Sequence, residues 1–161
     1  MKYLVSLYQK LVTYKIQDSD YIIINSFKCD QIHEVIQYGY ANVSEFKKVS
    51  YGEFKKFIYS KNSFILYSLQ AFISFRLIAE YGSKRLYIYE FHVMKQFQGQ
   101  SFGTKQLEII IGVAQFLAIR YIALTVDVDN HKGIQFWKQN KFVIAKESPD
   151  NESYIILQRR V

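Results

Sequence analysis

The chain has 161 residues, enough for one domain and too few for two of ordinary size. Hydrophobic residues make up 50% of it and aromatic residues 17%, which excludes an intrinsically disordered chain, and the single cysteine, Cys29, excludes an internal disulfide and favours a reducing compartment. The formal charge of +7 favours a polyanionic partner, whether nucleic acid, a membrane surface or a phosphate-bearing cofactor.

The first 60 residues carry weak signals of secondary structure. Apolar residues recur at helical spacing over 2–12, although a strand is not excluded there, and the run 21–24 predicts a buried strand. Asp30 can cap a helix that carries Ile32, Val35 and Ile36, and a further short helix is predicted over 54–59.

The middle of the chain predicts a sheet. Segments rich in β-branched and aromatic residues predict strands over 63–69, 71–80 and 85–93. Residues 81–84, which include Gly82, are typical of a hairpin turn between the last two of these strands.

The hydrophobic period then changes to that of a helix. One apolar face is formed by Leu107, Ile110, Ile111, Ala114, Leu117 and Ala118. Strands are predicted over 121–126, 142–145 and 153–157, and a helix over 130–140. Strands followed by alternating helices and strands are typical of an α+β or mixed α/β fold, and no linker divides the chain, so we expect one domain over residues 1–161.

The segment 86–104 is the most informative for function, because a strand runs into a loop of small residues that opens a helix. Backbone N–H groups at a helix start lack intrahelical acceptors, and the helix dipole favours an anion there, so the loop can hold a pyrophosphate. Gly99, Ser101 and Gly103 would let the backbone approach the phosphates. An ordinary turn between strand and helix is the alternative, and the spacing is that of neither a Walker P-loop nor a Rossmann fingerprint.

Two motifs resemble those of the GCN5-related N-acetyltransferase (GNAT) superfamily. They are Gln98-x-x-Ser101-x-Gly103 and Asn130-x-x-Gly133-Ile134-x-Phe136-Trp137. The first resembles the acetyl-CoA loop, (Arg/Gln)-x-x-Gly-x-(Gly/Ala), with Ser101 in place of the first glycine. The second resembles the superfamily segment Asn-x-x-Ala-(aliphatic)-x-(aromatic)-(aromatic), and the two occur in the expected order and at the expected separation.

Within the superfamily, the chain resembles the NatD-type N-terminal α-acetyltransferases. The matching segments are Phe72-x-x-Phe75-Arg76, Leu86-Tyr87-x-Tyr89-Glu90, Leu124-Thr125-Val126 and Ser153-Tyr154-x-Ile156-Leu157-x-Arg159-Arg160. NatD enzymes acetylate the α-amine of histone H4 and the related histone 2A. The resemblance therefore implies acetyl-CoA as the cosubstrate, no metal, and a histone N-terminal tail or another peptide N-terminus as the acceptor.

The resemblance also implies the GNAT acyl-CoA N-acyltransferase fold, a central twisted mixed sheet with helices on both faces. The sheet would be splayed between the strands that end near Val93 and Val126. Cofactor-binding residues implied at the splay and in the loop are Phe91, His92, Val93, Gln98, Gly99, Gln100, Ser101, Phe102, Gly103, Thr104, Thr125 and Asn130. For Asn130, capping of the following helix is an equal alternative.

Glu90 is the candidate catalytic base, acting directly or through water, with a strand-end salt bridge as the alternative. Tyr87 and Tyr89 are candidate catalytic residues that would orient the amine; alternation puts them on one strand face and Glu90 on the other. A β-bulge or a strand splay is needed to bring the three together. His92 is either an alternative base or a structural histidine, and Trp137 stands where many members keep a tyrosine acid.

The acceptor site is predicted from carboxylates at strand ends, Glu80, Asp127 and Asp129, with Tyr38 or Tyr40 as one wall. Ile78 stands where the NatD family has an acidic residue that receives the histone tail. We expect an intracellular monomer, in the cytoplasm, the nucleus or both, with no membrane association and no direct nucleic-acid binding. Two rival functions stay open: an acetyltransferase for another peptide or small amine, and a non-catalytic module that binds acetyl-CoA.

Overall fold

The computed structural model describes residues 9–11, 14, 16, 22–25, 33, 36–37, 39–41, 49–58, 63–80 and 82–161. The elements with assigned bounds are β1 (Ile22–Asn25), α3 (Tyr51–Ile58), β2 (Ser63–Tyr67), β3 (Ala71–Glu80), β4 (Ser83–Val93), a 3₁₀ turn η1 (Lys95–Phe97), α4 (Phe102–Phe116), β5 (Tyr121–Asp127), α5 (His131–Gln139), β6 (Val143–Ile144) and β7 (Tyr154–Arg160). Residues 9–11, 33, 36–37 and 39–41 are helical, in the two regions where early helices are predicted. Cys29, Asp30 and the candidate substrate residue Tyr38 lie outside the described residues.

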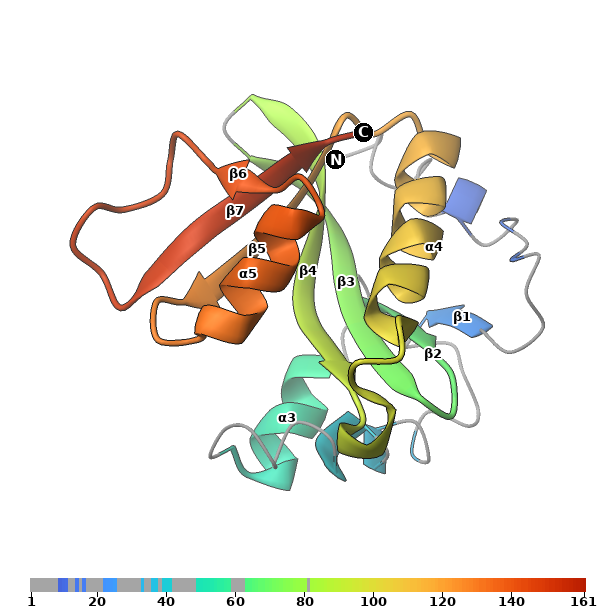
Figure 1. The fold of residues 1–161 in the computed structure, drawn as a ribbon. Helices are drawn as coiled ribbons and strands as arrows, with labels where there is room; N and C mark the ends of the chain where they lie inside the picture. Colours follow the sequence, from blue (N-terminus) through green and yellow to red (C-terminus); the bar gives the residue numbers. More distant parts are fainter. Residues whose placement is uncertain are drawn as a thin grey trace.

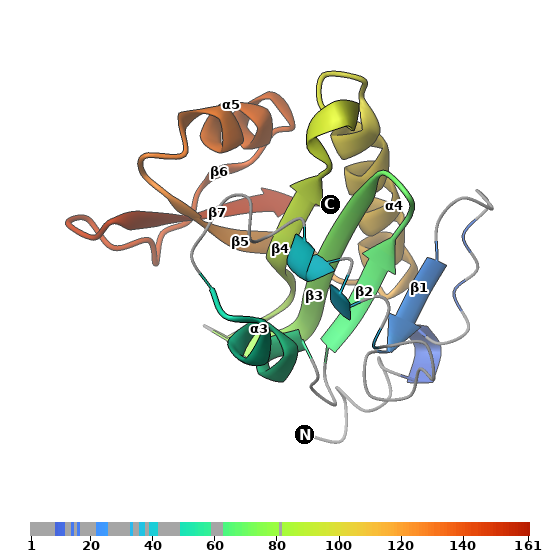
Figure 2. The same cartoon turned by 90° about the horizontal axis from the view of Figure 1, so that it is seen from below.

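The strands form one mixed sheet in the order β1-β2-β3-β4-β5-β7-β6. Strands β1 to β4 are antiparallel neighbours, β4 and β5 are parallel, and β7 pairs antiparallel with both β5 and β6. Figures 1 and 2 show the long strands β3 and β4 at the centre of this sheet. The predicted mixed sheet is confirmed.

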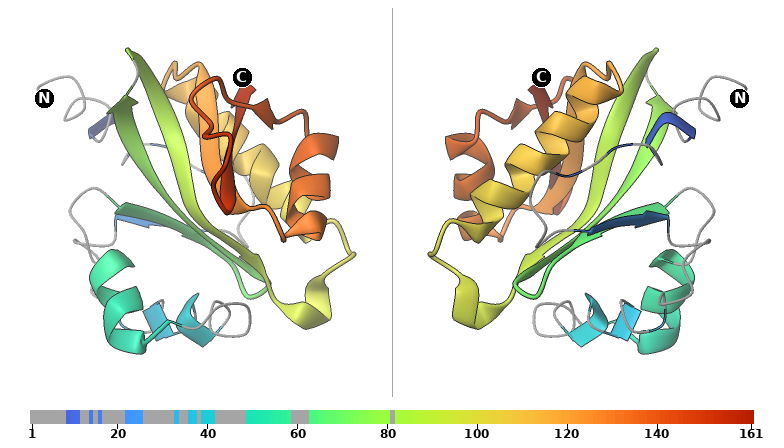
Figure 3. Two further views of the ribbon diagram at one scale, coloured as in Figure 1. Left: turned by 90° about the vertical axis from the view of Figure 1, so that its left-hand side faces the viewer. Right: turned by 90° about the vertical axis from the view of Figure 1, so that its right-hand side faces the viewer.

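Helices cover both faces of the sheet, as the GNAT resemblance implies. Figure 3 shows α4 and α5 on one face and α3 on the other. The α4 face carries the larger core, in which Leu107 and Ile110 pack with strand residues such as Leu86. The α3 face carries a second, smaller cluster around Phe54 and Phe72.

A capping box starts α3 at Tyr51. The Ser50 backbone N–H donates to Glu53 Oε2 over 3.0 Å, and the Glu53 backbone N–H donates to Ser50 Oγ over 3.2 Å. The Ser50 hydroxyl also donates to Glu53 Oε2 over 2.7 Å. These bonds satisfy N–H groups that have no acceptor within the helix, so the helix begins three residues before the predicted start at 54.

Strands β4 and β5 separate before either one ends. Their pairing stops at Ile88 and Leu124, although β4 continues to Val93 and β5 to Asp127. The predicted splay is therefore present, and the β5 side of β4 from residue 89 onward has no described strand beside it.

The pairing of β3 with β4 contains a bulge. Ser74 pairs with Glu90 and the next residue, Phe75, pairs with Ile88, so Tyr89 is an extra residue on β4. The strand therefore bends at the point where it leaves β5, as the sequence required if Glu90 and the tyrosines are to meet.

Two strand predictions at the carboxyl end differ from the structure. The strand predicted over 142–145 reduces to Val143–Ile144, because Lys141 has a left-handed backbone (φ 66°) and the Phe142 side chain packs into the core. The strand predicted over 153–157 continues to Arg160, because it pairs along the whole of β5.

Candidate functional site

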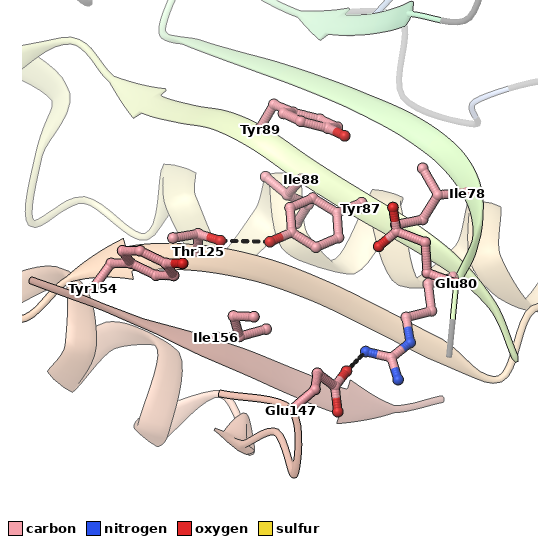
Figure 4. A pocket seen from close by; sticks show the side chains of 10 residues that line it. Ile78, Glu80, Tyr87, Ile88, Tyr89, Thr125, Glu147, Tyr154 and Ile156 are labelled. Carbon is pink, nitrogen blue, oxygen red and sulfur yellow. Dashed lines mark hydrogen bonds and ion pairs between the residues drawn. The ribbon is translucent and has the colours of Figure 1, made fainter. Parts of the chain in front are cut away.

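A cavity of about 370 Å³ lies where β3, β4, β5 and β7 meet. It is lined by Ile78, Glu80, Arg85, Tyr87, Ile88, Tyr89, Thr125, Glu147, Tyr154 and Ile156. Figure 4 shows Tyr87, Tyr89 and Tyr154 around this cavity, with Ile78 and Glu80 on the neighbouring strand. Tyr89 also packs against Phe57 of α3, with ring centroids 5.3 Å apart, which places the cavity on the α3 face of the sheet. We call this cavity the groove.

Alternate residues of β3 face the same side as the groove. Phe72 packs against Phe54 of α3, and the Arg76 guanidinium lies 4.9 Å from the centre of the Phe57 ring. Ser74 lies between these two residues on the strand, so alternation gives it the same face.

The bulge brings the candidate catalytic residues of β4 to this face. Tyr87, Glu90 and His92 lie directly opposite Arg76, Ser74 and Phe72, respectively. Residues directly opposite each other in a ladder share a face, so Tyr87, Glu90 and His92 all face the α3 side. Tyr89, the extra residue, faces it as well, because it lines the groove. The bulge thus brings Tyr87, Tyr89 and Glu90 to one face of the sheet, although simple alternation would separate Glu90 from the two tyrosines.

Glu90 is buried and hydrogen-bonded to His92. Glu90 is 7% exposed, and its Oε2 lies 2.8 Å from His92 Nε2. An ionised carboxylate can only accept, so in that state His92 Nε2 carries the shared proton. The buried hydroxyl of Ser74, directly opposite Glu90, has no hydrogen-bond partner among the described residues. Glu90 and His92 stand beside the groove and do not line it.

Tyr87 closes the narrow end of the splay. Its hydroxyl lies 2.5 Å from the hydroxyl of Thr125, the first β5 residue beyond the last paired position, Leu124. The Tyr87 and Tyr89 ring centroids are 5.1 Å apart. Thr125, predicted among the cofactor-binding residues, therefore lies in the wall of the groove.

A buried ion pair that sequence reasoning missed lies at one end of the groove. Arg85 Nη1 donates to Glu147, and the two side chains are only 8% and 13% exposed. Tyr154 and Ile156 were also missed as groove residues. Strand alternation could have indicated that Arg85 shares a face with Tyr87. No local pattern could have indicated its partner, Glu147, which lies 62 residues away in the sequence.

The predicted pyrophosphate seat has the expected backbone. The first helical hydrogen bond of α4 runs from the Lys105 N–H to the Ser101 carbonyl, so the N–H groups of Phe102, Gly103 and Thr104 have no acceptor within the helix. Ser101 has φ 64° and Gly99 has φ 74°, both left-handed. This conformation explains why the superfamily motif has glycine at the position of Ser101.

The side chains of this loop mainly hold the loop itself. Gln98 Nε2 donates to the Val93 carbonyl over 3.0 Å, and Gln100 Nε2 donates to the Gln96 carbonyl over 2.9 Å. A Cβ atom on Gly103 would lie 3.3 Å from the Phe136 ring, so glycine lets α4 approach α5 closely. The predicted anion seat is thus made of backbone N–H groups. The Gln98 side chain donates to the Val93 carbonyl and so lies against the end of β4.

Phe91 points to the other face of the sheet, into an aromatic cluster. Its ring centroid lies 4.8 Å from that of Trp137, and Trp137 lies 4.9 Å from Phe142. Trp137 is buried, so the position where many superfamily members keep a tyrosine acid belongs to the core in this chain. Phe91, His92 and Val93 lie on the part of β4 beyond its pairing with β5, where the resemblance implies that their backbone groups bind the cofactor.

The remaining predicted residues divide between groove and periphery. Glu80 lines the groove, whereas Asp127 and Asp129 are exposed and do not line it. Asn130 caps α5, with its Oδ1 accepting the Gly133 N–H over 2.9 Å, which is the alternative given for it. Within the described ranges no group of three or more His, Cys, Asp or Glu could hold a metal ion. None of the helices described is long and apolar enough to span a membrane.

Comparisons with known proteins identify the family and the fold of the chain. The sequence profile described as "Acetyltransferase (GNAT) family" matches residues 34–142. A search of curated proteins gave no significant match.

Among solved structures, Ard1 from Thermoplasma volcanium is similar with a TM-score of 0.65, 17% identity and coverage of 88% of this chain and 98% of that one. Arabidopsis thaliana Naa50 in complex with the bisubstrate analogue CoA-Ac-MVNAL is similar with a TM-score of 0.62 and 17% identity, and the match covers 87% of this chain and 98% of that one. The PaiA N-acetyltransferase from Thermoplasma acidophilum in complex with coenzyme A is similar with a TM-score of 0.63 and 14% identity, and the match covers 88% of this chain and 99% of that one. These likenesses show a shared fold, and because the family profile covers more than half of the sequence, the chain belongs to the acetyltransferase (GNAT) family.

Proposed function

We propose that this acetyltransferase transfers the acetyl group of acetyl-CoA to the α-amine of a peptide or protein N-terminus. The observation that carries the proposal is the β4 bulge, which sets Tyr87, Tyr89 and Glu90 on the groove face beside the open end of the splay. An acceptor amine in the groove would meet a thioester held at the splay.

The cofactor would be held mostly by backbone. The N–H groups of Phe102, Gly103 and Thr104, which have no acceptor within α4, suit the pyrophosphate, and the part of β4 beyond its pairing with β5 suits the amides of the pantetheine arm. The structures of PaiA with coenzyme A and of Naa50 with a CoA bisubstrate analogue support acetyl-CoA as the cosubstrate.

The chemistry asks little of the protein. A peptide α-amine has a pKa of about 7.7–8.0, so a sizeable minority is already neutral at cellular pH and modest base assistance suffices. The amine nitrogen attacks the thioester carbonyl, the carbon–sulfur bond breaks, and CoA leaves as the thiolate. Glu90 takes the proton of the amine through a water molecule, since its side chain stands beside the groove and not in its lining.

A histone tail is the first acceptor to test, on the NatD resemblance. A tail that begins Ser-Gly-Arg-Gly-Lys needs a carboxylate, and Glu80 supplies one in the groove with no ion pair to a described residue. The Naa50 analogue, which joins CoA to a peptide beginning Met-Val, supports the wider class of peptide N-termini. Ile78 and Ile156 in the lining also suit an uncharged first residue.

The test measures thiol release from acetyl-CoA with three peptides: one starting Ser-Gly-Arg-Gly-Lys, one starting Met-Val-Asn-Ala-Leu, and an N-terminally blocked copy of the first. We expect turnover with a free N-terminus and none with the blocked copy. Activity on the blocked copy would move the acceptor to a lysine side chain and overturn the proposal.

Glu90→Gln serves as the matched variant, with Glu108→Gln on the exposed face of α4 as its control. We expect kcat to fall by about 10-fold to 100-fold in the first and to stay unchanged in the second. Equal turnover in folded Glu90→Gln would remove Glu90 from the mechanism.

A further inference from the structure

We propose that His92 is a positioning residue that holds the Glu90 carboxylate in place for proton transfer, and this inference rests on the proposed function. His92 Nε2 and Glu90 Oε2 are 2.8 Å apart, and both side chains are largely buried, at 14% and 7% exposure. A hydrogen bond to a charged group in such surroundings is stronger than one in water.

The fold brings these two side chains together. They are two positions apart on β4, after the bulge, so their side chains stand next to each other on the groove face. A glutamate side chain has several rotamers of similar energy, and a bond from a neighbouring imidazole selects one of them. The His92 backbone is itself fixed opposite the fully buried Phe72.

The proton balance shows why His92 acts only through Glu90. The amine proton passes through a water molecule to the Glu90 carboxylate as the nitrogen lone pair attacks the thioester carbonyl. CoA thiolate carries away the electron pair of the broken carbon–sulfur bond. His92 keeps its own Nε2 proton throughout and donates it to Glu90 Oε2 before and after the transfer, so it neither gains nor loses a proton.

The first test compares two substitutions of His92. His92→Gln keeps an N–H donor of similar reach, whereas His92→Leu removes it. We expect His92→Gln to retain kcat within about 3-fold and His92→Leu to lose about 10-fold or more, with the KM for acetyl-CoA unchanged in both. In a Glu90→Gln background the loss from His92→Leu should disappear. Full kcat in His92→Leu, or equal losses in the two variants, would overturn the proposal.

His131→Gln is the control for loss of a histidine, because His131 is exposed at the start of α5. Its turnover and thermal stability should match those of the unaltered protein. Thermal melting of each His92 variant checks that the fold survives the substitution.

A second measurement needs no His92 variant that might misfold. The chain has 3 histidines, so ¹⁵N-histidine spectra of the unaltered protein resolve their tautomers, and Glu90→Gln identifies His92 as the ring whose signals move. We expect the Nε2-protonated tautomer for His92, and an Nδ1-protonated tautomer would overturn the pairing. Absence of turnover by the unaltered protein on every amine would instead reject the proposed function, so the two failures are distinguishable.

Discussion

The guanidinium of Arg76 lies over the ring of Tyr89, 4.7 Å from its centroid, and so ties β3 to the bulged residue of β4. Phe57 of α3 stacks on the same guanidinium at 4.9 Å. Arg76 Nε donates to Ser63 Oγ over 3.0 Å, and Nη2 donates to the Phe57 carbonyl over 2.9 Å. One side chain thus joins α3, β2, β3 and the bulge.

Replacement of Arg76 by lysine should destabilise the protein and lower its turnover. Lysine keeps the charge and loses both the planar stacking and the fork of donors, so we expect a loss of about 1–3 kcal/mol in the free energy of unfolding. Urea denaturation measures this loss, and turnover should fall because Tyr89 loses its support. Arg120→Lys, at an exposed position, is the control and should leave both unchanged. A folded Arg76→Lys protein as stable as the original would show that the stack is not structural.

Tyr87 and Thr125 should act as one unit in turnover, because their hydroxyls bond across the end of the splay. Tyr87→Phe and Thr125→Val each remove this bond, and we expect each to lower kcat by about 10-fold. The double variant should be no slower than the worse single one, which a double-mutant cycle on kcat measures. Additive losses would mean that the two hydroxyls contribute separately.

Ser101→Gly should stabilise the protein. Ser101 has a left-handed backbone, which costs a non-glycine residue about 1–2 kcal/mol, while the greater freedom of glycine in the unfolded chain returns part of that. We therefore expect a gain of up to about 1 kcal/mol in the free energy of unfolding. Thr104→Gly, in the first turn of the helix, is the matched control and should lose roughly 0.3–0.5 kcal/mol. Loss of stability in Ser101→Gly would mean that the serine side chain supports the loop.

The capping box of α3 should give a pH dependence to stability. Hydrogen bonds from the Ser50 side chain and backbone hold the pKa of Glu53 below its ordinary value. Because the pKa is lower in the folded state, this contribution is fully present above the unfolded value of about 4.3 and is lost as the pH falls through the folded value. Unfolding of Glu53→Gln and the original protein at several pH values should show a difference at neutral pH that disappears in acid. A difference that grows in acid would contradict this assignment.

The long strands could be predicted from sequence, whereas the side-chain pairs of the site could not. Residues 71–80 form the predicted strand because β-branched and aromatic residues pack well in a buried sheet. The helix α4 forms where apolar residues recur at helical spacing. The need for a bulge near Glu90 followed from strand alternation, but its position at Tyr89 depends on the register with β3. The Arg85–Glu147 pair and the role of Tyr154 depend on β7 returning beside β5, which no local pattern encodes.

Tyr89 has no pairing partner on β3 in the ladder between β3 and β4. Groove-facing positions on β4 are odd-numbered before it, as at Tyr87, and even-numbered after it, as at Glu90 and His92. A chain from which Tyr89 alone was deleted would alternate without interruption, so Glu90 and His92 would keep their partners on β3 and their face, while the local bend would be lost. The face on which Glu90 lies is therefore the same with or without Tyr89, whereas the bend of β4 at this point depends on that residue.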